Sequence, residues 1–200
     1  MNLNSMVDNN HKQKLIIIII ILFIVLIFIL WFILKKTKKI NNLLPIVPQV
    51  DLNRYQGLWY EIARLPTYFE KGCIGATASY QLNNDKTINV LNKCTISGEE
   101  ISVTGIAFPD FNEIIPGSNI YPGSFTVRFA PNPISKSKVS GEYKIIYLDP
   151  NYQYAMVGTS NRNNLWILSR KNSINNTTFN MLIDFAKKYG FDINKLIINQ

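Results

Sequence analysis

The chain has 200 residues, 47% of them hydrophobic, with 21 Lys plus Arg against 13 Asp plus Glu. Six of the basic residues and one of the acidic residues lie within residues 1–44, so residues 45–200 carry 15 basic against 12 acidic side chains. A nucleic-acid binder concentrates basic residues on one face of its domain, so we expect no nucleic-acid partner. The single histidine, His11, precedes the domain. This excludes His-dependent nucleophilic catalysis and His-ligated metal sites within it, and we expect neither a metal nor another cofactor.

An uninterrupted apolar run begins at Leu15 and ends at Leu34, without a charge, glycine or proline. As a helix rising ~1.5 Å per residue, such a run spans about 30 Å, the thickness of the hydrocarbon core of a bilayer. A cleaved signal peptide has a shorter apolar region that is followed by small residues, whereas lysines follow this run. We therefore predict a tail over 1–14, a transmembrane anchor over 15–34, a linker over 35–50 and one folded domain over 51–200.

Two observations disagree about the side of the membrane on which the domain lies. Four lysines follow the apolar run and two precede it, a bias that places the domain on the cytosolic side. Glycosylation sequons at Asn175 and Asn176, together with the cysteines Cys73 and Cys94, suit an oxidising compartment outside the cytosol instead. We expect a single-pass membrane protein with an extracytoplasmic domain, and the cytosolic alternative stays open.

Eight short β-rich runs separated by turn residues predict an antiparallel barrel or sandwich. Eight strands also suffice to close a barrel around one small ligand. After the last run, a polar stretch that begins at Ser173 caps a predicted helix over 178–189, which ends before Gly190, and a short final strand is predicted within 192–198. The predicted strands are 57–64, 76–82, 88–95, 101–108, 124–129, 141–148, 154–159 and 165–170.

Alternation assigns faces to the second and third predicted strands. Their apolar side chains recur at even positions, from Ala76 to Tyr80 and on to Val90, so even positions should point into the barrel. Asn92 continues this inward row. A polar side chain in an apolar cavity is costly unless it is satisfied by a ligand or by another partner, such as buried water or a loop carbonyl, and both interpretations remain open.

The hairpin between these two strands also bears on the two cysteines. A three-residue turn at 83–85 would pair position 82 with 86 and place Cys94 opposite Ile74, one residue from Cys73. A bulge near Gly72 or Gly75 would then bring the cysteines together in a disulfide. The alternative is a free Cys94 thiol inside the barrel.

Three motifs in this chain resemble the signatures of the lipocalin family. Residues 52–64, which include Gly57 and Trp59, resemble the first signature, Gly-x-Trp at the start of the first strand. The turn with Asp149 and Tyr152 resembles the second signature, Thr-Asp-x-x-Tyr, with leucine in place of the threonine, and residues 165–170 resemble the third, which is centred on an arginine, here Arg170. The resemblance covers 51–200 and is closest to bacterial outer-membrane lipocalins and apolipoprotein D. The lipid-modified cysteine of the bacterial members is absent here.

The resemblance implies an all-β fold, an eight-stranded antiparallel up-and-down lipocalin barrel with one C-terminal α-helix, here preceded by a single transmembrane helix. It also implies structural roles for the five signature residues: in the family, the tryptophan matching Trp59 plugs the floor of the barrel, and the arginine matching Arg170 lies across its ring. Such a cation–π contact contributes about 0.5–2 kcal/mol.

The function implied by the resemblance is the binding, storage or transport of small hydrophobic ligands, fatty acids or lysophospholipids, without catalysis. Strand parity and the family's inward positions give the ligand-binding candidates Tyr80, Val90, Asn92, Phe129 and Trp166, each of which could instead simply fill the barrel. Two alternatives remain. One is a membrane-tethered display or interaction module with a filled barrel. The other is a thiol-dependent isomerase that uses Cys94, as in some lipocalins, although the basic neighbour Lys93 would point to the opposite face.

Overall fold

The computed structural model describes residues 3–41, 43–129 and 140–199, and it divides into two units, Met1–Leu43 and Leu44–Gln200. In the first unit, helix α1 covers Leu3–Asn41, a segment without glycine or proline. Its part Ile16–Lys35 is long and apolar enough to cross a membrane. Large apolar side chains are exposed along this whole part, whereas a helix on the surface of a soluble domain presents one polar face. The helix extends beyond both ends of the predicted span.

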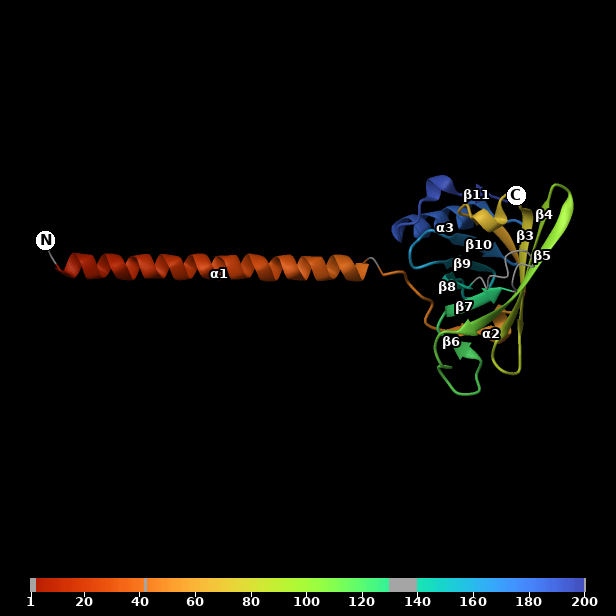
Figure 1. Ribbon diagram of the computed structural model, residues 1–200, viewed down its shortest axis with the longest axis horizontal. Helices are drawn as coiled ribbons and strands as arrows, with labels where there is room; N and C mark the ends of the chain where they lie inside the picture. Colours follow the sequence, from red (N-terminus) through yellow and green to blue (C-terminus); the bar gives the residue numbers. More distant parts are fainter. Residues whose placement is uncertain (1–2, 42, 130–139, 200) are drawn as a thin grey trace. The chain divides into compact units, whose positions relative to one another are not determined.

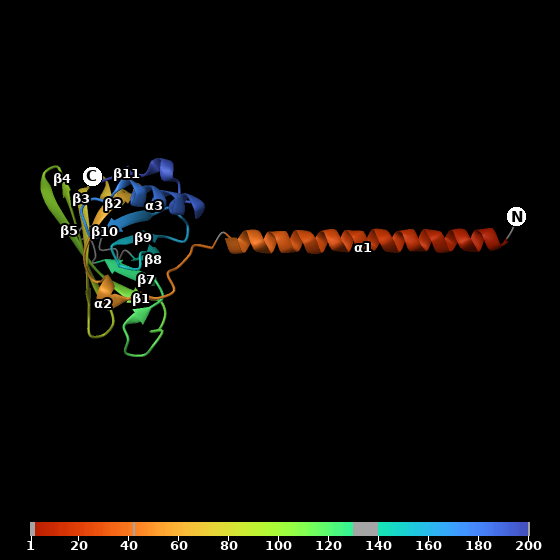
Figure 2. The same ribbon diagram turned by 180° about the vertical axis from the view of Figure 1, so that it is seen from behind.

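The second unit is an eight-stranded antiparallel barrel in which each strand pairs with the next along the chain and the last pairs with the first. Figures 1 and 2 show the barrel from opposite sides. The predicted strands are confirmed, with ends that differ by at most two residues. The barrel strands are β2 (Gly57–Arg64), β3 (Ile74–Leu82), β4 (Ile88–Ile96), β5 (Glu99–Pro109), β7 (Ser124–Phe129), β8 (Ser140–Leu148), β9 (Tyr154–Gly158) and β10 (Leu165–Ser169).

Smaller elements surround the barrel. A two-stranded sheet pairs β1 (Val50–Asp51) with β6 (Ile120–Tyr121), and the one-turn helix α2 (Leu52–Tyr55) leads into β2. The C-terminal helix α3 (Asn176–Lys188) begins two residues before the predicted start. The predicted final strand is partly wrong, because i→i+3 hydrogen bonds form the 3₁₀ helix η2 (Ile193–Lys195), which leaves only β11 (Ile197–Ile198) extended.

The direction of the strands gives the barrel two different ends. At one end lie α2, the start of β2, and the turns β3–β4 (83–87) and β8–β9 (149–153), and we call it the closed end. At the other end lie the β2–β3 loop (65–73), which contains the 3₁₀ helix η1 (Tyr68–Glu70), and the β4–β5 turn (97–98), and we call it the mouth. Figure 2 shows α2 and the β4–β5 turn at opposite ends.

The β3–β4 hairpin corrects one prediction and confirms another. Leu82 pairs with Ile88 rather than with residue 86, because the N–H of Asn83 bonds the carbonyl of Thr87 at 2.8 Å and enlarges the turn by two residues. Even positions still face even positions. The register then shifts between Ile74 and Thr77, around Gly75, whose φ of +62° favours glycine. This bulge lies where one was predicted.

The bulge brings Cys73 and Cys94 together. Their sulfur atoms are bonded at 2.02 Å, so the predicted disulfide is confirmed. Both cysteines of the chain are used in this bond. The free-thiol interpretation of Cys94 is therefore wrong, and the isomerase alternative loses its only candidate nucleophile.

Two hydrophobic clusters divide the domain. One fills the barrel interior around Trp59 and Phe125, and the other lies outside, between α3 and strands β8, β9 and β10. Helix α3 contributes Leu182 and Ala186, both fully buried, to the outer cluster. Helix α3 therefore covers one outer face of the barrel and contributes no side chain to the interior cluster.

Candidate functional site: the barrel interior

The closed end is sealed around Trp59, which is fully buried and donates its indole N–H to the carbonyl of Tyr55 at 2.8 Å. The Arg170 guanidinium lies 3.9 Å from the centre of the Trp59 ring. Because guanidinium N–H groups form a planar fork, the same group also donates to a set of carbonyls at the turn into β2. These belong to Arg54, Tyr55, Gln56 and Leu58. The guanidinium also donates to the carbonyl of Tyr152, in the β8–β9 turn.

Gly57 is required where this seal is tightest. Its φ is +95°, and a β-carbon added there would lie 3.4 Å from the Arg170 Nη1 atom. Any other residue would therefore adopt a strained backbone conformation at this position, with its β-carbon in van der Waals contact with the guanidinium. This explains the glycine two residues before Trp59 in the first signature.

The second signature closes the β8–β9 turn against the same end. The Asp149 carboxylate accepts hydrogen bonds from the backbone N–H groups of Asn151 at 2.9 Å and Tyr154 at 2.7 Å. The turn therefore forms although leucine replaces the usual threonine before Asp149. The Tyr152 hydroxyl accepts the backbone N–H of Asp51 at 3.0 Å, which ties the turn to β1.

A layer of three tyrosines fills the middle of the barrel. The Tyr143 hydroxyl lies 2.8 Å from the hydroxyls of both Tyr55 and Tyr80. Burial raises the pKa of all three phenols above the usual value of 10, so they are neutral hydrogen-bonding groups at physiological pH. Below this layer remains a cavity of about 20 Å³, enough for one water molecule. The closed half is thus packed.

The mouth half differs, because inward-facing side chains there remain accessible. Pairing places Val90 opposite Gly105, Asn92 opposite Val103 and Cys94 opposite Ile101. Val90 is only 4% exposed, yet Val103 and Ile101, next along the same inward row of β5, are 46% and 42% exposed. The apolar inner wall is therefore open to solvent near the mouth.

The five candidate ligand residues fall into two groups. Val90, Asn92 and Phe129 line one wall from β4 and β7, with the Phe129 ring lying over Gly105, where an added β-carbon would approach it to 2.9 Å. Trp166 stands on the inner wall of β10, while Tyr80 lies deeper and belongs to the tyrosine layer. Four therefore border the accessible half, and Tyr80 forms its base.

A larger hollow of about 840 Å³ lies against strands β3, β4, β5 and β7. Most side chains around it, such as Ser79, Leu91 and Thr104, belong to the outward rows of these strands, since they alternate with the interior residues Tyr80 and Val90. This volume is therefore not that of the barrel interior.

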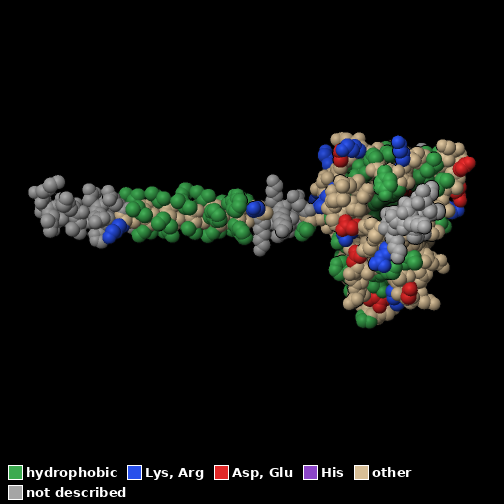
Figure 3. Space-filling model, in the orientation of Figure 1, with side chains coloured by type: hydrophobic (Ala, Val, Ile, Leu, Met, Phe, Trp, Pro, Cys, Tyr) green, Lys and Arg blue, Asp and Glu red, His purple; other side chains and the backbone are tan. Residues whose placement is uncertain are grey.

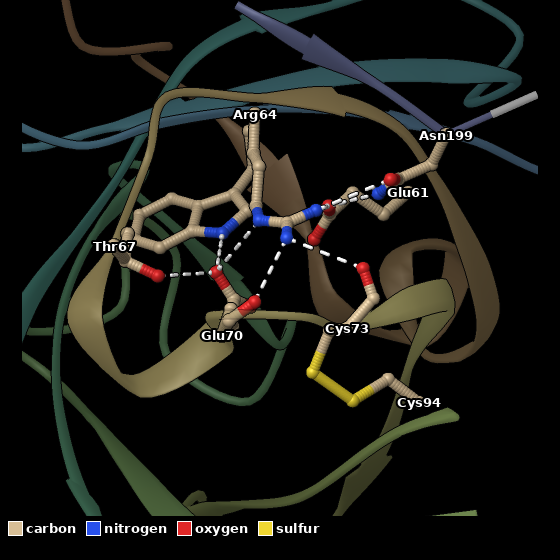
Figure 4. A network of polar contacts seen from close by, with 8 residues as sticks. Glu61, Arg64, Thr67, Glu70, Cys73, Cys94 and Asn199 are labelled. Atoms are coloured by element: carbon tan, nitrogen blue, oxygen red, sulfur yellow. Dashed lines mark hydrogen bonds and ion pairs between the residues drawn. A yellow bond between two sulfur atoms is a disulfide. The ribbon is translucent and has the colours of Figure 1, made fainter. Parts of the chain in front are cut away.

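A buried polar cluster that the sequence interpretation missed lies near the mouth (Figure 4). Its centre is Arg64, 2% exposed, whose guanidinium bonds the Glu61 carboxylate at 2.8 Å and lies 3.6 Å from that of Glu70. Glu70 also accepts the indole N–H of Trp166 at 3.2 Å, and the Asn199 carboxamide bonds both Arg64 and Glu61. The cluster thus joins β2, the β2–β3 loop, β10 and the end of the chain.

The cluster has an unusual electrostatic balance, because two carboxylates face one guanidinium. Burial, and then the nearby charge of Glu70, raise the pKa of Glu61 to about 7, against the opposing effect of Arg64. Arg64 also donates to the carbonyls of Glu70 and Cys73, which links the cluster to the disulfide. Parity with Trp59 could have placed Glu61 inward, but the register shift between β2 and β10 turns Arg64 inward in a way that no alternation predicts.

A barrel packed at one end and accessible at the other is an architecture that holds a small ligand inside. Comparison with known proteins then gives the family: residues 50–200 match the lipocalin-like domain. The chain therefore belongs to the lipocalin family, whose members bind small hydrophobic ligands.

Individual relatives agree with this assignment. A protein of Acanthamoeba polyphaga mimivirus named as a lipocalin is 45% identical over 150 residues, covering 75% of this chain and 84% of that protein. The outer membrane lipoprotein Blc of Vibrio cholerae is 36% identical over 157 residues, 77% and 84% of the two chains. Bacterial outer membrane lipoproteins and apolipoprotein D, the two groups that the motifs resemble, are both among the relatives.

The solved structure of insecticyanin from Manduca sexta has the same fold. It superposes with a TM-score of 0.59 at 21% identity, covering 78% of this chain and 84% of that chain. This likeness supports the barrel architecture alone.

Proposed function

We propose that this protein is a membrane-anchored lipocalin that holds a single-chain lipid, a fatty acid or a lysophospholipid, in the mouth half of its barrel. The observation that carries the proposal is the exposure of Val103 and Ile101 on an inner wall whose closed half is packed. An apolar chain there would cover these side chains and could reach the tyrosine layer, while its polar head stays near the mouth. Asn92, Phe129 and Trp166 are the proposed lateral contacts.

A matched pair of substitutions tests the binding site. Val103→Trp would fill the accessible half, whereas Thr104→Trp places the same ring on the outer face of β5, where Thr104 is exposed. Full-length protein in lipid nanodiscs is titrated with a fluorescent fatty acid and then with lysophosphatidylcholine as competitor. We expect Val103→Trp to weaken probe binding at least tenfold and Thr104→Trp to leave it unchanged. Equal binding by both variants would refute the proposed site.

The anchor is proposed from the apolar segment Ile16–Lys35 of α1. An integral helix keeps the chain in the membrane during alkaline carbonate extraction, whereas a cleaved signal sequence releases a shorter, soluble chain. Intact mass and carbonate extraction of the native protein therefore distinguish the two.

The extracytoplasmic placement is proposed from the cysteines and the sequons. Asn175 and Asn176 are exposed at the start of α3, and the Asn175 side-chain oxygen caps the helix by accepting the N–H of Thr178 at 2.8 Å. A glycan on the side-chain nitrogen would leave that cap intact. A mobility shift on treatment with a glycosidase that removes N-linked glycans, lost in the Thr177→Ala/Thr178→Ala variant, would support this placement. Protease sensitivity of the domain only from the cytosolic side would contradict it.

A second candidate, a tethered module with a filled barrel, is favoured by the packed tyrosine layer and its cavity of only about 20 Å³. Organic extraction of the purified protein that yields no lipid, together with no probe binding, would select this candidate over the carrier.

A further inference from the structure

Along the described barrel strands, the only basic side chain on an inward row is that of Arg64. The other bases of these strands lie on the outer face, because they alternate with interior side chains. They are Lys93, Arg128 and Lys144. After burial, the charges of Glu61 and Glu70 are what raise the pKa of Tyr80. Both carboxylates of the polar cluster therefore act on the same interior as the tyrosine layer.

The donors of Arg64 are all directed at groups of the protein itself (Figure 4). Its Nη1 donates to the Glu61 carboxylate at 2.8 Å and to the Asn199 side-chain oxygen at 3.2 Å. Its Nη2 donates to the carbonyls of Glu70 at 2.9 Å and Cys73 at 3.3 Å, and its Nε lies 3.6 Å from the Glu70 carboxylate. A guanidinium recognises an anionic ligand through a free fork of N–H groups. Within the described part of the chain, the interior strands have no such fork for an anionic head.

The two carboxylates of the cluster keep unused acceptor capacity. A carboxylate has two oxygens with about four lone-pair sites. Glu61 uses Oε1 for Arg64 and Asn199. Glu70 uses Oε2 for the Trp166 indole and for the ion pair with Arg64. Within the described residues, no hydrogen bond reaches Glu61 Oε2 or Glu70 Oε1, so the free groups of the cluster are acceptors and its ionised form has one cation against two anions.

Trp166 places an aromatic ring beside this excess of negative charge. It pairs with Arg64 across β10 and β2, and it is half-buried on the inner wall. Its bond to Glu70 uses the N–H at the edge of the ring and not the ring faces. The Glu70 side chain is 17% exposed, so a ligand can reach the carboxylate and the ring together. An indole face attracts ammonium groups, and quaternary ammonium ligands are bound by such faces.

The outer surface of the domain does not favour cations. On the face that Figure 3 shows, the basic and acidic side chains are interspersed rather than gathered by sign. Residues 45–200 carry 15 basic against 12 acidic side chains, so the field of the whole domain slightly favours anions. A preference of the barrel for a cationic ligand would therefore have its origin in the interior cluster.

We propose that the polar cluster is a head-group site that selects single-chain lipids with an ammonium head, held between the Glu70 carboxylate and the Trp166 ring, with Glu61 supplying the second negative charge. This rests on the proposed function, in which the chain lies along the apolar wall and the head stays near the mouth. An ammonium restores the charge balance of the cluster, whereas the carboxylate of a free fatty acid meets two like charges. Lysophospholipids with an ammonium group and long-chain amines share the selected chemistry.

Protonation of Glu61 makes this selection depend on pH. The groups that face Glu61 are Arg64 on its own strand, Glu70 from the β2–β3 loop, Asn199 at the end of β11 and the neutral phenol of Tyr80 on β3. Burial raises the pKa of Glu61 to about 7, so this acid is mostly protonated at pH 6 and mostly ionised at pH 8. A bound cation favours the ionised acid. Binding of a permanent cation should therefore strengthen as the pH rises through 7, and binding of a permanent anion should weaken.

Two amphiphiles with equal chains and non-titrating heads test the selection. Full-length protein in phosphatidylcholine nanodiscs is loaded with the neutral fluorescent probe N-phenyl-1-naphthylamine, and the signal of empty nanodiscs is subtracted. Hexadecyltrimethylammonium and hexadecyl sulfate then displace the probe in separate titrations. At pH 8 we expect the ammonium to compete at a concentration about tenfold or more below that of the sulfate, and this ratio to shrink at pH 6.

Three variants locate the origin of the preference. Glu70→Gln and Glu61→Gln should each reduce the ratio at pH 8 by about threefold or more, and Glu61→Gln should also abolish its change with pH. The matched control is Glu100→Gln, which removes an exposed carboxylate that pairs with Lys93 on the outer face near the mouth. It should leave the ratio unchanged. Circular dichroism checks the fold, and Glu61→Gln, which has the shape of the protonated acid, keeps the test decisive if Glu70→Gln does not fold.

Each outcome has a defined meaning. Equal competition by the two amphiphiles at pH 8, tighter binding of the sulfate, or an ammonium preference that both Glu61→Gln and Glu70→Gln retain would overturn the inference while the carrier function stands. Binding of neither the probe nor the amphiphiles would refute the proposed function itself. Lysophosphatidylcholine is the third competitor. Competition at the concentration of the ammonium amphiphile supports a phosphocholine head as the source of the cation, and weaker competition supports a long-chain amine.

Discussion

Replacing Glu61 by glutamine should remove most of the pH dependence of the domain's stability between pH 5 and pH 8. Burial raises the pKa of Glu61 from 4.5 to about 7 in the folded chain. Between pH 4.5 and pH 7, the folded state therefore keeps a proton on Glu61 that the unfolded state has lost. The stability that this bound proton contributes is complete below about pH 4.5 and is lost as the pH rises through 7. A shift of about 2.5 pKa units corresponds to about 3.5 kcal/mol, at ~1.4 kcal/mol per pKa unit.

No histidine of the domain adds its own pH dependence to this measurement, because the only histidine, His11, lies outside the domain. Urea unfolding of the full-length protein in detergent, followed by tryptophan fluorescence, should show the wild type losing about 2.5 kcal/mol from pH 5 to pH 8. Glu61→Gln should lose less than about 1 kcal/mol, and a control at an exposed carboxylate, Glu99→Gln, should behave as the wild type. A wild type whose stability is flat or rises with pH, or a Glu61→Gln variant with the full loss, would refute the reasoning.

Variants at three further sites follow from the same structure, each measured by urea unfolding. Arg170→Met should lower the free energy of unfolding by about 2–4 kcal/mol, from the lost cation–π contact and the unpaired carbonyls, and Arg170→Lys should not restore it, since an ammonium lacks the planar fork. Replacing Cys73 and Cys94 together by alanine should cost about 3 kcal/mol, because the bond closes a loop with a sequence separation of 21; an unchanged midpoint would exclude this. Asn199→Ala should cost about 1–3 kcal/mol. It should also move the pH at which stability falls to a more alkaline value, because the Asn199 hydrogen bond lowers the pKa of Glu61.

The sequence predicts the barrel well where its pattern is local. Alternation in β3 and β4 placed Asn92 on the inward row, and Gly75 was one of the two glycines near which the bulge that joins Cys73 to Cys94 was predicted. The predicted register of the hairpin was wrong by two residues because the hydrogen bond between Asn83 and Thr87 sets the length of the turn. A single hydrogen bond of this kind leaves no periodic pattern in the sequence.

The polar cluster around Arg64 could not be predicted from the sequence in the same way. Its members come from segments up to 138 residues apart in the chain, as the bond between Glu61 and Asn199 shows. From the sequence alone, Arg64 is an ordinary charged residue at the end of a strand, and only the register shift between β2 and β10 explains why its side chain is buried. The conformation of residues 110–119, between β5 and β6, could not be predicted for a related reason: side chain to backbone bonds such as that of Glu113 to Gly117 order this loop without any repeating pattern.

The pairing of the first barrel strand, β2, with the last, β10, constrains the order in which the domain can fold during synthesis. Strand β2 pairs with β10 (Leu165–Ser169) and β11 (Ile197–Ile198), more than 100 residues further along the chain, so these segments have to be synthesised before the sheet can close. The β3–β4 hairpin and its disulfide are local and can form much earlier. During synthesis the chain therefore passes through an open sheet with the edge of β2 unpaired, the kind of edge to which other strands add. Truncation before residue 165 should trap this stage, and chaperones that hold exposed strand edges are the partners expected to protect it.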